Sequence, residues 1–100
     1  MQINYTQKHI RLSDDQKAYI EDKLDSLKKF RKVEDESTLI KVDVEFFDSK
    51  IAKENLSFTV NMIIPHATVR AEVDCVTIEE GIDLAIEKLR SQLEKYKDKH

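Results

Sequence analysis

Basic side chains are the residues of this sequence whose spacing suggests a chemistry. On a helix that turns by about 100° per residue, Lys88, Lys95 and Lys99 lie on one flank of the apolar face, and Arg90 lies on the other. Ammonium and guanidinium groups with suitable spacing can contact the phosphates of a nucleic acid. The candidate phosphate-binding residues are Lys17, Lys23, Lys28, Lys29, Lys88, Arg90, Lys95 and Lys99.

These cations come from two helical segments of a chain whose formal net charge is −3. A negative total argues against indiscriminate binding of any polyanion. If the two helices pack side by side, however, their facing flanks can pool cations into a groove that is locally positive. The alternative is that the lysines lay their aliphatic stems along the edge of the core and leave their charges in water. The sequence leaves both interpretations open.

No arrangement of residues predicts catalysis, a metal site or a cofactor. Cys75 falls on the apolar phase of a predicted strand, so a buried thiol is favoured over a nucleophile. His9 is isolated from acids at ligand spacing. A chain with one glycine has no glycine-rich phosphate loop. We therefore expect a protein that is not an enzyme.

Length and composition predict one domain over residues 1–100, because 100 residues with 40% hydrophobic content can build one modest core. The first twenty residues contain no unbroken apolar run, so neither a secretory signal nor a membrane span is expected. The single cysteine excludes an internal disulfide and fits a reducing compartment. These features predict a cytoplasmic protein that does not contact a membrane.

Alternation of apolar and polar residues predicts four strands. One lies within residues 1–12 and ends irregularly, and three more follow in succession at 40–46, 56–64 and 67–75. The turn between the last two contains Pro65. Because each strand has one apolar side, we expect an antiparallel sheet that is covered on one face and solvated on the other.

Two capping boxes predict where the helices begin. Ser13 is followed by Gln16 and Thr77 by Glu80, each pair three residues apart. Apolar residues at helical spacing then give each helix a single apolar face. The element order is strand, helix, three strands, helix, and both helices must cover the one apolar face of the sheet. The predicted fold is therefore α+β, with a two-layer β-α-β-β-β-α arrangement.

The whole chain also resembles a known family, the ribosome hibernation factors, which include hibernation promoting factor and the ribosome-associated inhibitor protein Y. The segments that carry the resemblance are MQINYT at the start, Ser13 with Tyr19-Ile20 and Lys23-Leu24, Gly81-Ile82-Asp83, Ile86–Leu89 and Ser91–Lys99. One departure is Ser91, which stands where the family usually has an arginine, with Arg90 one place earlier. The resemblance implies a fold akin to a double-stranded-RNA-binding domain.

The same resemblance implies a function. Members of the family bind 16S rRNA of the small ribosomal subunit in the channel for mRNA and tRNA, and so promote ribosome hibernation. The basic helix residues named above would carry the RNA contacts, on the small subunit alone and in the 70S ribosome. Because the chain ends at His100, it resembles the short form, which acts with a separate ribosome modulation factor, and we expect a monomer off the ribosome. The alternative is a regulatory module that binds a protein, like a sigma-factor modulator, without contacting RNA.

Overall fold

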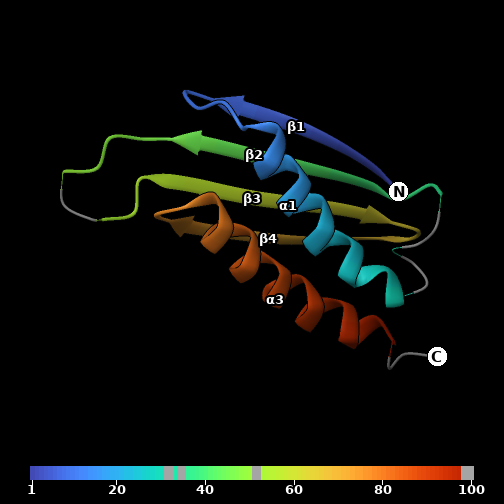
Figure 1. Ribbon diagram of the computed structural model, residues 1–100. Coiled ribbons are helices and arrows are strands. Elements are labelled where there is room, and N and C mark those ends of the chain that lie inside the picture. The colour runs from blue at the N-terminus through green and yellow to red at the C-terminus, as the bar shows by residue number, and fades with distance from the viewer. Residues whose placement is uncertain (31–32, 34–35, 51–52, 98–100) are drawn as a thin grey trace.

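The computed structural model of the chain describes residues 1–30, 33, 36–50 and 53–97. Its elements follow the predicted order, and Figure 1 shows both helices on the same face of the sheet, which confirms the two-layer α+β fold. The strands are β1 (Gln2–Lys8), β2 (Leu39–Phe46), β3 (Leu56–Ile64) and β4 (Ala67–Cys75). The helices are α1 (Asp14–Asp25), the 3-10 helix η1 (Ser26–Lys29) and α3 (Ile78–Lys97).

The sheet has the strand order β1-β2-β3-β4 and is mixed. The expectation of a wholly antiparallel sheet is wrong for one pair, because β1 and β2 run parallel while β2-β3 and β3-β4 are antiparallel. The chain between β1 and β2 contains α1, and such a helical crossover returns the next strand in the same direction. Alternation of residues shows which face of a strand is buried, but it does not show the direction of the neighbouring strand.

Alternating residues of the four strands form rows that run across the sheet. Tyr5, Val42, Val60 and Ala71 form one such row on the face that the helices cover, and the last three are buried. The neighbouring row of Asn4, Lys41, Asn61 and Arg70 lies on the other, polar face. The core is therefore a single layer between the sheet and the two helices.

The N-termini of the helices use side-chain caps as the sequence predicts. The backbone N–H of Gln16 donates to Ser13 Oγ at 3.1 Å, and the N–H of Ser13 donates to Gln16 Oε1 at 2.9 Å. At α3 the N–H of Glu80 donates to Thr77 Oγ1 at 3.1 Å, but the Glu80 carboxylate accepts from the N–H of Val76 instead of that of Thr77. In this second capping box, the hydrogen bond to the Glu80 carboxylate therefore comes from Val76, one residue before the capping residue Thr77.

Gly81 sets how closely α3 approaches the sheet. A Cβ atom at this position would lie 2.8 Å from Cys75 Sγ and 3.1 Å from a ring carbon of Phe58. Both of these side chains are fully buried, as predicted for Cys75. The absence of a side chain at Gly81 lets the first turn of α3 rest on β3 and β4, and this packing fixes the position of the basic residues further along the helix.

Candidate nucleic-acid interface

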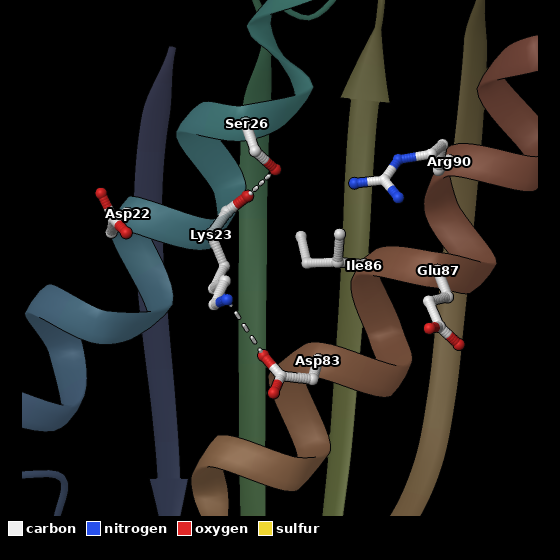
Figure 2. A pocket seen from close by; sticks show the side chains of 7 residues that line it. All are labelled: Asp22, Lys23, Ser26, Asp83, Ile86, Glu87 and Arg90. Carbon is white, nitrogen blue, oxygen red and sulfur yellow. Dashed lines mark hydrogen bonds and ion pairs between the residues drawn. The ribbon is translucent and has the colours of Figure 1, made fainter.

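A groove with a volume of about 420 Å³ lies between α1 and α3 (Figure 2). It is the place where the sequence predicts that cations from the two helices meet. From α1 and η1 come Asp22, Lys23 and Ser26; from α3 come Asp83, Ile86, Glu87 and Arg90. Two of the predicted phosphate-binding residues, Lys23 and Arg90, therefore line the groove.

Lys23 is held by a carboxylate of the facing helix. Its Nζ lies 3.7 Å from Oδ1 of Asp83 and 5.3 Å from the ring centroid of Tyr19. The Tyr19 hydroxyl donates to the same carboxylate, with distances of 3.0 and 3.1 Å to its two oxygens. Partial burial and the hydrogen bond to the Asp83 carboxylate raise the pKa of Tyr19 above its ordinary value. Asp83 thus ties two residues of α1 to α3.

Arg90 enters the groove from the opposite wall. Figure 2 shows its guanidinium group reaching over Ile86 toward α1. Its Nε atom is buried and has no hydrogen-bond partner among the residues that the structure describes. Leaving a buried donor unsatisfied costs about 1–3 kcal/mol. The Nε–H group of Arg90 is therefore a hydrogen-bond donor without an acceptor among the described residues.

The charges of the groove correct the expectation that it pools cations. Three acidic residues, Asp22, Asp83 and Glu87, line it together with the two cations, and Figure 2 shows the Asp83 carboxylate pointing toward Lys23 of the facing helix. Helical periodicity does not indicate that Asp83 faces Lys23, because their pairing depends on how α1 packs against α3. The groove is mixed in charge and is not a positive channel.

Lys17 lies on the other side of α1, over the first strand. Its Nζ is 5.4 Å from the ring centroid of Tyr5, whose hydroxyl donates to Glu21 at 2.7 Å. Burial, together with the hydrogen bond and charge of Glu21, raises the pKa of Tyr5 well above its ordinary value. Lys17 therefore does not share a surface with Lys23.

The other predicted residues near the end of α1 lie on η1. Lys28 pairs with Asp25 at 3.2 Å, and the Nζ of Lys29 lies 5.3 Å from the ring centroid of Phe30. Both side chains are exposed. Lys99 lies outside the described residues, so its place on the flank of the last helix stays a prediction.

Lys88 and Lys95 lie on the flank of α3 that faces away from the groove, and both are exposed. The Nζ of Lys88 donates to the backbone carbonyl of Glu72 in β4 at 3.1 Å. Among the residues that the structure describes, neither lysine forms a salt bridge with a carboxylate. This flank therefore presents two cations that no described carboxylate pairs with.

The described residues contain no group of three or more His, Cys, Asp or Glu side chains that could hold a metal ion. Burial raises the pKa of the Cys75 thiol to about 11, with contributions from Glu80 and Asp74, so the thiol is not an activated nucleophile. No helix in the described part of the chain is long and apolar enough to cross a membrane.

The solved structures that this chain resembles include two proteins. A ribosomal subunit interface protein from Coxiella burnetii is 25% identical, with 99% of this chain and 100% of that chain covered and a TM-score of 0.79. The N-terminal domain of Protein Y from Thermus thermophilus is 20% identical, with 96% and 99% covered and a TM-score of 0.76, and it supports the fold. No curated protein matches the chain.

Residues 3–100 match the family model described as sigma 54 modulation protein / S30EA ribosomal protein. The match covers the helices, β2, β3, β4 and all of β1 except Gln2, and it includes both walls of the groove. It confirms the resemblance to ribosome hibernation factors that the sequence motifs indicate. The chain belongs to the sigma 54 modulation protein / S30EA ribosomal protein family.

Proposed function

We propose that residues 1–100 act as one domain that binds the small ribosomal subunit and holds ribosomes inactive. The observation that carries this proposal is the family match over residues 3–100, supported by the likeness to a protein named for the ribosomal subunit interface. The binding site on the ribosome would be 16S rRNA in the channel for mRNA and tRNA. The domain would act there by occupying the space of these ligands, without a chemical step.

The α3 flank with Lys88 and Lys95 would begin the contact, since it presents two exposed cations on one side of a helix, without carboxylate partners among the described residues. Phosphate contacts by such residues supply affinity that does not depend on sequence. Arg90 would add a second type of contact, because its guanidinium group lines the groove and a guanidinium can donate hydrogen bonds to phosphate oxygens. Lys17, Lys23, Lys28, Lys29 and Lys99 complete the proposed set.

The partners that follow from this proposal are the small subunit, the 70S ribosome and a separate ribosome modulation factor, in the cytoplasm. The free protein would be a monomer. Shape and phosphate contacts would dominate recognition, as is usual for folds that bind structured RNA.

Sedimentation through sucrose gradients tests the proposal. The protein should migrate with purified small subunits at low salt and be released at high salt. The Lys88→Glu, Lys95→Glu variant should lose this co-migration and keep its circular dichroism spectrum. The matched control is Lys41→Glu, Lys53→Glu, which changes the charge equally at exposed positions away from α3 and should still bind. Equal binding by both variants would reject the proposed surface.

A second candidate function is binding to a regulatory protein, which the words "sigma 54 modulation" in the family description favour. The polar face of the sheet would then be the contact surface. The two candidates differ in their response to salt and to RNA. Binding to purified sigma 54 that persists at high salt, with no co-migration with ribosomal subunits, would support the second candidate and exclude the first.

A further inference from the structure

The outer edge of β4 is occupied by side chains of α3. β4 is a terminal strand of the sheet, and the unpaired backbone groups of such a strand are a template for adding another strand. The N–H of Arg70 donates to Gln92 Oε1 at 3.1 Å, and Gln92 Nε2 donates to the carbonyl of Arg70 at 2.6 Å. One side-chain amide thus satisfies both backbone groups of one edge residue, as a neighbouring strand would.

Lys88 extends this arrangement by one step along the strand. It donates to the carbonyl of Glu72, two residues from Arg70 and on the same edge. Residues four apart on a helix rise by about 6 Å, and residues two apart on a strand by about 6.8 Å. Because these repeats nearly match, Lys88 and Gln92, one turn apart on α3, reach successive outward-facing positions of β4.

Gln92 is also held in place from its own helix. Its Nε2 lies 3.3 Å from the carbonyl oxygen of Lys88, so the amide donates both to the preceding turn and to β4. Because the Gln92 amide already bonds to its own helix, the side chain loses little further conformational entropy when it also bonds to β4. The cover is therefore part of the folded structure and does not depend on a partner.

The edge beneath this cover is complementary to itself. If two copies of β4 paired antiparallel about Ala71, Arg70 of each copy would stand opposite Glu72 of the other. On the helix-covered side, Val69 would stand opposite Val73, and both are apolar. Opposite charges and apolar pairs directly across an antiparallel ladder are stabilising. In the monomer, the side chains of Arg70 and Glu72 form an ion pair at 2.9 Å on the polar face of the sheet. In the paired form each would face the oppositely charged residue of the other copy, so each side chain has a partner in both forms.

We propose that the β4 edge is a surface for antiparallel pairing with a second copy of this chain, and that Gln92, assisted by Lys88, keeps it closed in the monomer. The inference does not require ribosome binding. Gln92 is outside the proposed set of RNA contacts, so its substitution tests the edge alone.

The first test compares Gln92→Ala with Ser91→Ala, an exposed neighbour on the same helix. Amide hydrogen exchange measured by NMR at low protein concentration should be about tenfold faster at Arg70 in Gln92→Ala and unchanged in Ser91→Ala. In sedimentation velocity over a concentration series, the wild type and Ser91→Ala should remain monomeric, and Gln92→Ala should form dimers. Circular dichroism shows whether the fold is kept, which we expect because alanine is the best helix former.

The second test asks whether dimers use the proposed register. Adding Arg70→Glu to Gln92→Ala places Glu against Glu72 of the other copy and should abolish the dimer. Adding both Arg70→Glu and Glu72→Arg restores opposite charges and should restore it. A folded Gln92→Ala variant that stays monomeric at every concentration would overturn the proposal, as would a dimer that is indifferent to Arg70→Glu.

Discussion

Lys23 of α1 and Asp83 of α3 form an ion pair across the groove, with 3.7 Å between Nζ and Oδ1, and the Tyr19 hydroxyl donates to the same carboxylate. The pair joins the two helices at a half-exposed position, where an ion pair contributes about 0–1 kcal/mol to stability. Its larger effect is on charge, because Asp83 neutralises a cation that the proposed RNA contact needs.

Replacing Asp83 with asparagine should therefore strengthen binding to the small subunit. Lys23 loses its carboxylate, and one more cation becomes available for phosphate, so the slope of log K against log salt should steepen by up to about one. The free energy of unfolding should change by less than about 1 kcal/mol. Asp48→Asn makes the same charge change at an exposed position far along the chain and is the control. If Asp83→Asn binds no more tightly than Asp48→Asn, the groove does not take part in RNA contact.

Gly81→Ala should destabilise the fold even though alanine favours helices by about 1 kcal/mol over glycine. The new Cβ would lie 2.8 Å from Cys75 Sγ and 3.1 Å from Phe58, and overpacking of this kind costs about 1–3 kcal/mol. We expect a net loss of up to about 2 kcal/mol in urea unfolding. In the double variant Gly81→Ala, Cys75→Ala the sulfur is gone, so its loss should be smaller than the sum of the single losses. If the two losses of unfolding free energy add exactly, a side chain at position 81 does not clash with Cys75.

The pKa of Cys75 predicts a fall in stability at alkaline pH. Burial raises this pKa from 9.0 to about 11, so between these values the folded protein keeps a proton that the unfolded chain has lost. The contribution is fully present below pH 9 and is lost as pH rises through about 11, by up to about 3 kcal/mol. Urea unfolding from about pH 8 to about pH 11 should therefore show a shallower decline for Cys75→Ala than for the wild type. Parallel declines would contradict this, since Tyr5 and Tyr19 titrate in both proteins.

The turn between β3 and β4 should discriminate between side chains at position 66. His66 has a φ of 67°, and Pro65 precedes it, a pattern typical of a type II turn. A β-branched residue is poorly tolerated at such a φ, so His66→Val should lower the free energy of unfolding by about 1–2 kcal/mol. His66→Gly removes the steric conflict and should be at least as stable as the wild type within about 0.5 kcal/mol. Thermal unfolding that ranks Val equal to Gly would show that the strained backbone conformation has no energetic consequence.

The sequence predicts the elements of this fold well because burial leaves a periodic record. Val42 and Val44 mark the buried phase of β2, and Ser13 with Gln16 marks the start of α1. The direction of β1 leaves no such record, since its residues alternate in the same way beside a parallel or an antiparallel neighbour.

The candidate site is predictable only in part for a related reason. A helical projection shows that Lys88 and Arg90 lie on opposite flanks of α3, and this is correct. It does not show which flank faces α1 and which faces β4, because that depends on tertiary packing. In the folded protein Lys88 reaches the β4 edge, and Arg90 reaches the groove. The acid opposite Lys23 is not predictable from the periodicity of α1, because the carboxylate of Asp83 belongs to the other helix.

The salt dependence of binding to purified small subunits tests the central claim most directly. Replacing Lys88 and Lys95 with glutamine should weaken binding and reduce the slope of log K against log salt by about two, because each substitution removes one cation that binds a phosphate. Lys41→Gln, Lys53→Gln should leave the slope at the wild-type value. The same slope in all three proteins would contradict a phosphate-binding surface on this flank of α3.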